Sequence, residues 1–329
     1  MHEVLVATPL KSSPVSRPYE LADGISIREL SSIRWDVSIV KGFISERERE
    51  DLANTRYWLC AAKEYEHIFG DVGDELYDAT YHAAMALQII CPIGAKHIFL
   101  KFQQTSEGWD NIGSYHPKEL CSTLLGRIPH LEHQGLTNFD AVYAGIRRAF
   151  AKELVRLQNP ILLLEHGMQI GNIYLGSLMF VMALDMLFMA GEISPFMQRV
   201  GGFLGLGSLV FPDSLKNYQP KATVREVIRD LYDLRNIIAH GQEIPKHPYR
   251  EKRDLISTGG QRINDDDYYY SELMLESGLF MLTTALRKVF TEGLFDDVAD
   301  PAKWRLKMRT YEHRYKEAGG LDAAKPRGR

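Results

Sequence analysis

The stretch Leu231-Tyr232-Asp233-Leu234-Arg235-Asn236-Ile237-Ile238-Ala239-His240-Gly241 closes an amphipathic segment in the second half of this 329-residue chain. Thr223 followed by Glu226 predicts a capping box, so a helix should begin at Thr223. Gly241 predicts the end of the helix, because glycine adopts the left-handed conformation of a C-terminal cap without strain. The sequence therefore places an arginine and a histidine in the last turns of one helix.

Arg235 falls within the apolar stripe of this predicted helix. The stripe is formed by Val224, Ile228, Leu231 and Ile238. An arginine on a core-facing stripe must be paired or must border a cleft, because an unpaired buried charge costs several kcal/mol. Asp185 is the single charge in the apolar run from Ile170 to Gly191, and it is the expected partner.

Arg235 and His240 cannot act on one group from the same face of an intact helix. Five residues of α-helix turn the side-chain direction by about 140°. Asn236 and His240, at positions i and i+4, do share a face. Two arrangements would bring Arg235 and His240 to one phosphate. Either the helix unwinds near Ala239, or a second subunit completes the site.

The composition is that of an ordinary globular protein. Hydrophobic residues make up 45% and charged residues 25% of the chain, and the length predicts about two domains. The formal net charge of −4 argues against a surface built throughout to coat nucleic acid, so any contact with RNA should be local. Cys60, Cys91 and Cys121 are widely spaced, which favours a reducing cytoplasm over a disulfide framework or a zinc site. The start of the chain, Met1-His2-Glu3-Val4, does not look like a signal peptide.

The apolar run from Ile170 to Gly191 is long enough for a membrane span, which takes about 20 residues. Asp185 opposes a span, since a carboxylate near the centre of a membrane helix costs about 2.5–3.5 kcal/mol. Glu165 and His166 also stand where flanking Lys or Arg would be expected. We therefore expect a helix that is buried on all sides, in a bundle or at a dimer interface, and no membrane contact.

The first half of the chain combines predicted helices and strands. Ser45 and Glu48 form a capping box that predicts a helix through about His67, and the segment from Gly70 to Gly73 interrupts it. The other elements expected here are a strand at 34–40, a helix at 74–90, a strand at 96–102, a connector at 105–117 and a helix at 140–158.

The second half is predicted to be helical throughout. The expected helices lie at 168–190, 195–203, 223–240 and 270–291. Beyond Pro301 the tail carries nine Lys or Arg against three acids, and apolar and aromatic residues recur at helical spacing: Trp304, Met308, Tyr311 and Tyr315. This tail is either a surface helix that docks its aromatic stripe, or a basic, aromatic-bearing element that tracks an RNA backbone.

The run from Leu231 to Gly241 resembles the signature of the HEPN superfamily, and more narrowly that of the Apea-like HEPN proteins of prokaryotes. Arg235-Asn236 followed by Ala239-His240-Gly241 carries most of the likeness. Further positions that contribute are Tyr232, Leu234 and the earlier run Ala183-Leu184-Asp185-Met186-Leu187. The resemblance covers about residues 160–295, and nothing functional is carried over to the N-terminal half.

The resemblance implies a metal-independent endoribonuclease without a cofactor, acting in antiviral defence or in a toxin-like system. His240 would take the proton from a ribose 2′-hydroxyl or protonate the leaving 5′-oxygen, and Arg235 would hold the scissile phosphate. Asn236 would orient the histidine or donate to a phosphate oxygen, and Asp185 would fix the arginine. The RNA products would carry a 2′,3′-cyclic phosphate. HEPN domains dimerise with their motifs facing each other, which implies a homodimer with a composite active site.

The expected fold is therefore mainly α. An N-terminal mixed α/β region at 1–160 would precede a HEPN-type helical bundle at 161–297 and a basic C-terminal helix and tail at 298–329. The N-terminal region would sense a trigger or hold the RNase in check. An Arg–Asp pair and a histidine at a helix C-terminus are also ordinary structural features. The alternative is a HEPN domain that serves as a non-catalytic dimerisation or ligand-binding module.

Weaker candidates lie outside this helix. The loop after the motif gathers a basic cluster, whose expected substrate-binding members are Lys246, Arg250, Lys252 and Arg253. The acids at 265–267 allow the same loop to be a balanced, solvated segment. The glycine-rich Gly201–Gly207 lacks the preceding strand and the Lys-Ser/Thr of a nucleotide-phosphate loop. His130 and His133 lack a third metal ligand other than Glu132.

Overall fold

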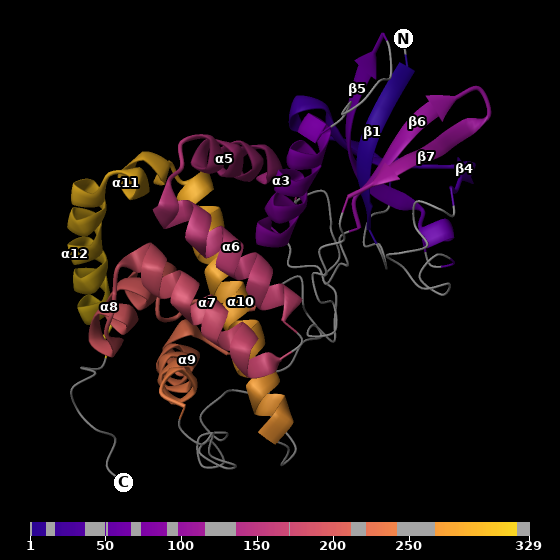
Figure 1. Cartoon of the computed structure of the whole chain (residues 1–329). Coiled ribbons are helices and arrows are strands. Elements are labelled where there is room, and N and C mark those ends of the chain that lie inside the picture. Colours follow the sequence, from indigo (N-terminus) through magenta and orange to yellow (C-terminus); the bar gives the residue numbers. More distant parts are fainter. Residues whose placement is uncertain are drawn as a thin grey trace. The chain divides into compact units, whose positions relative to one another are not determined.

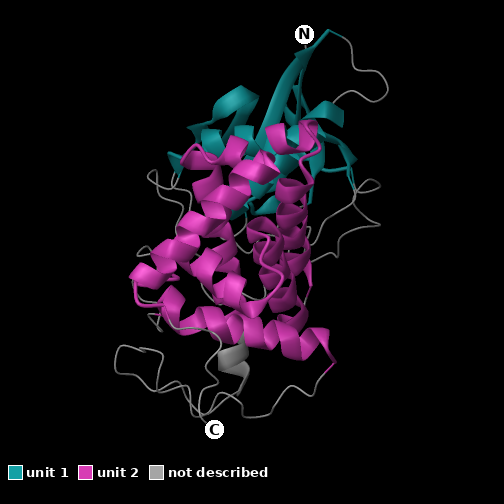
Figure 2. Ribbon diagram, turned by 90° about the vertical axis from the view of Figure 1, so that its left-hand side faces the viewer, with its two compact units in different colours: residues 1–147 teal, residues 148–329 magenta. Residues whose placement is uncertain are grey.

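The computed structural model describes most of the chain, and it divides these residues into two compact units, 1–147 and 148–329 (Figure 2). The described residues are 2–10, 17–36, 50, 52–66, 74–90, 98–115, 136–170, 172–211, 222–241 and 267–320, with the backbone alone described at 267–272. Each unit has its own secondary structure, a sheet in unit 1 and a helical bundle in unit 2. The described fold is mainly helical, with a sizeable sheet in unit 1.

Unit 1 is built on a seven-stranded sheet with the order β2-β3-β5-β1-β6-β7-β4 (Figure 1). The strands are β1 (His2–Pro9), β2 (Tyr19–Glu20), β3 (Ile25–Glu29), β4 (Ile33–Arg34), β5 (Tyr57–Tyr65), β6 (Leu100–Thr105) and β7 (Gly108–Ser114). A 3-10 turn, η1 (Ala22–Gly24), precedes β3. Neighbouring strands are antiparallel, except that β4 pairs with β7 in parallel.

The central strands of this sheet are buried on both faces. Helix α3 (Asp74–Ile90) packs against β1, β3 and β5, and the hydroxyl of Thr80 donates to the Val6 carbonyl at 3.0 Å. Side chains alternate between the faces of a strand. The opposite face carries a second cluster that includes Leu5, Ala7, Trp58, Cys60, Leu100 and Phe102. Burial raises the pKa of the Cys60 thiol to about 12, so this cysteine is a protonated core residue.

The predicted helix from Ser45 to His67 is wrong over its second half, where the chain forms strand β5. The run Tyr57–Ala61 is buried at every position, because α3 covers one face of β5 and the cluster around Trp58 and Cys60 covers the other. A short continuous apolar run fits a central strand as well as a buried helix, so periodicity alone cannot separate them. Ser45 and Glu48, the predicted capping box, lie outside the described residues.

Four other expectations in unit 1 are confirmed or corrected in detail. The predicted helix at 74–90 is confirmed as α3. The strand expected at 96–102 is present but begins at Leu100, and the connector expected at 105–117 contains β7 instead. Strand β7 escapes the apolar pattern because its residues are mostly half-exposed. The strand expected at 34–40 corresponds only to β4, and its residues from 37 onward are not described.

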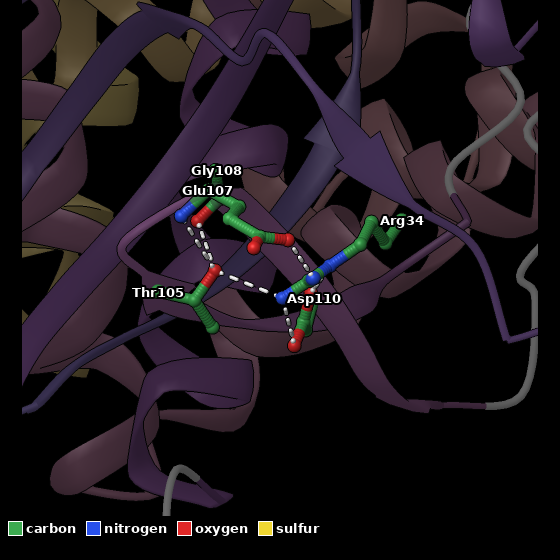
Figure 3. A network of polar contacts seen from close by, with 5 residues as sticks. All are labelled: Arg34, Thr105, Glu107, Gly108 and Asp110. Atoms are coloured by element: carbon green, nitrogen blue, oxygen red, sulfur yellow. Dashed lines mark hydrogen bonds and ion pairs between the residues drawn. The ribbon is translucent and has the colours of Figure 1, made fainter.

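The two-residue strand β4 is fastened to β7 by the side chain of Arg34 (Figure 3). Its guanidinium donates from Nε and Nη2 to the two carboxylate oxygens of Asp110, at 2.5 and 3.0 Å. Nη1 donates to Glu107 and Nη2 to the Thr105 hydroxyl. The Arg34 side chain is about half exposed, so the network fixes the position of the edge strand and adds little to stability.

Unit 2 is a bundle arranged around helix α7 (Figure 1). Helix α5 (Phe139–Ala151) contains the boundary between the units, and α6 (Val155–Gln169) follows it. The other helices are α7 (Ile173–Phe188), α8 (Ile193–Leu204), α9 (Val224–Ala239), α10 (Asp267–Thr291), α11 (Phe295–Ala299) and α12 (Pro301–Glu317). Helix α7 packs against α6, α8, α9 and α10. The helices predicted at 195–203, 223–240 and 270–291 are confirmed within a few residues.

Two predicted helices have different limits in the structure. The helix expected at 140–158 is two helices, because Glu153 adopts a left-handed conformation at φ 50° and ends α5 before α6 begins. The helix expected at 168–190 begins at Ile173, since 168 and 169 belong to α6.

Within the described ranges, no single helix is long and apolar enough to cross a membrane. Helices α7 and α8 satisfy length and composition only as a pair bent by 81°.

The aromatic stripe of the tail is buried, which confirms the docked surface helix and removes these rings from any stacking role. Its members are Trp304, Met308, Tyr311 and Tyr315. Helix α12 packs against α8, and the indole N–H of Trp304 donates to the Leu187 carbonyl at 2.6 Å. A Cβ placed on Gly202 would lie 1.9 Å from the Tyr311 carbonyl oxygen. The glycines at 201 and 202 therefore allow two helices to approach closely and belong to α8, not to a phosphate loop.

Candidate active site

Helix α9 begins and ends as its sequence predicts. The Glu226 carboxylate accepts hydrogen bonds from the backbone N–H and the hydroxyl of Thr223, both at 2.7 Å. Gly241 has φ +61°, the left-handed conformation expected after the last turn. The apolar stripe faces the core: Val224, Ile228 and Leu231 are buried, and Ile238 is partly buried. The direction of the Arg235 side chain is therefore set by the packing of α9.

The guanidinium of Arg235 is held by side chains from two helices. Nη2 lies 3.7 Å from Oδ2 of Asp185 on α7, so the pairing expected from the sequence is present. Nη1 donates to Oδ1 of Asn236 at 2.8 Å, and Cζ lies 5.3 Å from the ring centroid of Tyr232. The side chains of Arg235 and Asp185 are 24% and 14% exposed, so the pair lies at the edge of the core with access to solvent.

These contacts hold Arg235 in place but do not occupy all of the hydrogen-bond donors of its guanidinium. A separation of 3.7 Å is an ion pair but too long for a hydrogen bond. The Nε–H is buried and has no hydrogen-bond partner among the described residues. Arginine and a carboxylate frequently form two parallel hydrogen bonds, which are not present here. The Nη groups of Arg235 keep further N–H donors for which no described acceptor lies within hydrogen-bond distance, and these can bind an anion.

The partners of Arg235 are themselves tied to the turn between α7 and α8. The second oxygen of Asp185, Oδ1, accepts the backbone N–H of Gly191 at 2.6 Å. The hydroxyl of Tyr232 donates to the carbonyl of the same Gly191 at 3.1 Å. Burial raises the pKa of the Tyr232 hydroxyl, and the negative charge of Asp185 raises it further against the opposing charge of Arg235. Tyr232 thus stays protonated and keeps its hydrogen bond.

His240 is exposed at the end of α9, and its backbone bears on one of the two arrangements left open by the sequence, the unwinding of the helix near Ala239. The helix is intact through Ala239, and the backbone N–H of His240 donates to the Asn236 carbonyl at 3.0 Å. The helix therefore does not unwind before the histidine, and Arg235 and His240 point away from each other by about 140°. No described residue forms a hydrogen bond with the His240 imidazole.

The amide of Asn236 has a partner that the sequence analysis did not anticipate. Asn236 was expected to orient His240 or to donate to a phosphate, and its side-chain oxygen instead accepts from Arg235. Among the described residues none accepts from its amide nitrogen, which can donate to a phosphate oxygen. The contributions of Tyr232 and Gly191 were also missed. Gly191, which follows the long apolar run, is the single signal that marked this turn.

Helix α7 presents a partly exposed apolar face next to Asp185. Leu175 and Met186 are 41% and 38% exposed, and both lie on this face. Its other members, all partly exposed, are Leu178, Met182 and Met189. We call these five residues the methionine face. Their spacing places the first four on one side of α7, which Asp185 adjoins, and Met189 follows as the left-handed residue that caps the helix.

Several candidate residues lie outside the described part of the chain. These are the basic loop residues Lys246, Arg250, Lys252 and Arg253, and the histidines His130 and His133. Within the described ranges, no three His, Cys, Asp or Glu side chains are grouped as a metal site. Compared with models of known protein families, with curated proteins and with solved structures, the chain gives no significant match.

Removing the carboxylate of Asp185 is expected to destabilise unit 2. In Asp185→Ala, Arg235 loses its ion-pair partner and the Gly191 N–H loses its acceptor. The free energy of unfolding should fall by about 1–3 kcal/mol. Arg235→Ala should cost less in that background than in the wild type, because the uncompensated charge is then removed. Urea unfolding of the four proteins measures this coupling, and strictly additive effects would mean that the two side chains do not interact.

Proposed function

We propose that this protein is a metal-independent endoribonuclease of the HEPN type, similar to the Apea-like HEPN proteins. The observation that carries the proposal is the state of Arg235. Its guanidinium is held by Asp185, Asn236 and Tyr232, yet its donors are not consumed by them. The same helix ends in an exposed histidine. A fixed, forked cation and an imidazole are the two groups that cleavage of a phosphodiester requires.

The reaction would be a transesterification within RNA. His240 accepts the proton of a ribose 2′-hydroxyl, whose oxygen attacks the adjacent phosphorus while the bond from phosphorus to the 5′-oxygen breaks. A proton delivered to that 5′-oxygen completes the exchange and leaves a 2′,3′-cyclic phosphate and a 5′-hydroxyl. Arg235 binds the phosphate and stabilises the negative charge that grows on its oxygens. Asn236 adds a donor to a phosphate oxygen, and Asp185 positions the arginine.

A second copy of the chain would complete the site. Arg235 and His240 diverge on an intact helix, and this supports a site in which an arginine from one subunit and a histidine from its partner meet at one phosphate. The methionine face supports this arrangement, because it leaves apolar side chains partly exposed beside Asp185. Flexible methionines are common at surfaces that bind other proteins. We therefore propose a homodimer with a composite active site.

The alternative is a HEPN domain that binds a partner or ligand without catalysis. The same contacts favour it in one respect: Arg235 joins α7 to α9 and so has a structural use. In this alternative the methionine face forms the dimer interface, and His240 has no chemical role. The two functions differ only in what the dimer does to RNA.

Cleavage of RNA by the purified protein in EDTA tests the proposal. Total RNA and tRNA should be cut without added metal, and the fragments should carry 2′,3′-cyclic phosphate ends. Such ends resist phosphatase until acid opens the ring, which identifies them on a gel. RNA that stays intact over all protein concentrations would favour the binding module.

The biological setting follows from the resemblance alone. We place the protein in prokaryotic antiviral defence or in a toxin-like system that arrests growth. The N-terminal unit would receive the activating trigger or restrain the nuclease. A reducing cytoplasm is the proposed location, and the buried, protonated thiol of Cys60 agrees with it.

A further inference from the structure

Helix α12 carries a row of exposed cations beside its buried aromatic stripe. Arg305, Arg309 and Lys316 occupy positions i, i+4 and i+11, and all three are exposed. At 100° per residue their directions fall within about 40° of one another. The row runs for 11 residues, which is about 16 Å of helix. The aromatic stripe fixes it in place, because α12 cannot rotate without withdrawing Trp304 from the core.

The acidic residues on and near α12 form ion pairs or hydrogen bonds with other groups, and not with the three cations of this row. Glu312 pairs with Arg199 at 2.7 Å, and Asp297 pairs with Lys307 at 3.4 Å. Glu317 lies 3.6 Å from His313, and Asp300 accepts the backbone N–H groups at the start of the helix. Among the residues that the structure describes, no carboxylate lies within ion-pair distance of Arg305, Arg309 or Lys316. A positive row is thus left on a chain of net charge −4.

Arg156 at the start of α6 lies near Arg305, close to the N-terminal end of the row. Its Nη1 donates to the Val298 carbonyl at 2.9 Å, which fixes the guanidinium beside α12. Burial lowers the pKa of Arg156, and the neighbouring positive charge of Arg305 lowers it further. Two cations are therefore held near each other without an anion between them. Such an arrangement is stabilised when a polyanion supplies the missing charge.

We propose that Arg156, Arg305, Arg309 and Lys316 form a binding surface for the phosphate backbone of RNA. We call these four residues the α12 row. This inference rests on the proposed nuclease function and adds the place where the substrate strand is held. The row is several phosphates long, at about 3.4 Å of rise per phosphate of one strand. Its contacts are independent of base sequence, because the aromatic side chains of α12 are buried.

A lipid surface is the other polyanion that a basic helix can bind, and the structure argues against it. A helix that lies on a membrane inserts a free apolar face between the lipids. The apolar face of α12 is occupied by its contacts with α8. Leu306 is 66% exposed, but it stands among polar and charged neighbours. Phosphate contacts along a nucleic acid require only the cations.

Binding of a fluorescent 2′-O-methyl RNA to the full-length protein tests the row. This RNA cannot be cleaved by attack of a 2′-hydroxyl, so binding is measured apart from catalysis. Arg305→Gln combined with Arg309→Gln should weaken binding about tenfold or more at low salt. The slope of log affinity against log salt should fall by about 1.4, because each phosphate that a cation neutralises on a single strand contributes about 0.7.

Lys303→Gln combined with Arg314→Gln is the matched control. It removes the same charge from the opposite flank of α12 and should change affinity less than twofold. Circular dichroism should show that both double variants remain folded. An equal loss of RNA affinity in both double variants would contradict the proposed binding surface, since only the net charge of the protein would then matter. Binding of the wild type to phosphatidylserine vesicles but not to RNA would overturn it in favour of a lipid surface.

The same variants separate this inference from the proposed function. Row-dependent binding together with wild-type protein that never cleaves RNA would uphold the row and refute the nuclease. RNA cleavage that persists with unchanged binding in Arg305→Gln/Arg309→Gln would uphold the nuclease and refute the row.

Discussion

Cleavage of RNA is expected to fall at least about 100-fold in His240→Ala and in Arg235→Ala. A positioned general acid or base contributes about 100- to 10,000-fold, and one group that stabilises the reacting phosphate contributes about 100- to 1,000-fold. Both side chains reach solvent, so each variant should remain folded. Initial rates on a labelled RNA in EDTA measure the effect, and His166→Ala, which removes an exposed histidine from α6, is the control.

Mixing the two inactive variants tests whether the site is composite. In a heterodimer of Arg235→Ala and His240→Ala, one composite site carries both lesions and the other carries none. Half of the dimers form as heterodimers with one intact site each, so about a quarter of the activity should return. If each site uses the arginine and histidine of one subunit, no activity returns. Full activity in either single variant would refute the catalytic role of that residue.

Replacing Gly202 by alanine is expected to lower the stability of unit 2 by about 3 kcal/mol. The added Cβ would lie 1.9 Å from the Tyr311 carbonyl oxygen, and a backbone atom cannot turn aside as a side chain can. Helices α8 and α12 must therefore separate, which exposes the buried stripe around Trp304. The loss outweighs the gain of about 1 kcal/mol that alanine brings to a helix. The melting temperature should fall by about 6–12 °C.

Gly207→Ala is the control for this prediction. Nothing lies within 4 Å of a Cβ at Gly207, and its φ is not positive. Its melting temperature should stay within about 2 °C of the wild type. An unchanged melting temperature in Gly202→Ala would mean that α12 does not pack closely on α8.

Elements with clear start and stop signals were predictable from the sequence, and elements defined by distant neighbours were not. Helix α9 has a capping box and a glycine cap, and α3 follows a glycine-rich break, so both were placed within a residue or two. Strand β5 has no such local signal. Its apolar run became a strand because β1 and β3 provide hydrogen-bond partners on both edges, and both lie more than 25 residues earlier in the chain.

Some contacts of the candidate site were likewise predictable from the sequence, and others were not. Asp185 and Arg235 could be matched from sequence because each is a charge in an apolar stripe, and a buried charge needs a partner. The hydrogen bond from Arg235 to Asn236 depends on side-chain torsions, which spacing does not determine. The contacts of Gly191 depend on the angle at which α8 leaves α7, which is set by tertiary packing.

The turn at Gly191 makes the two supports of Arg235 interdependent. Its N–H donates to Asp185 and its carbonyl accepts from Tyr232, and both of these residues also contact the guanidinium of Arg235. A displacement of this turn would release the carboxylate and the phenol together. Arg235 would then lose both supports in one step, although Gly191 itself has no role in the proposed chemistry. Insertion of one residue at this turn should abolish the proposed RNA cleavage while the bundle stays folded.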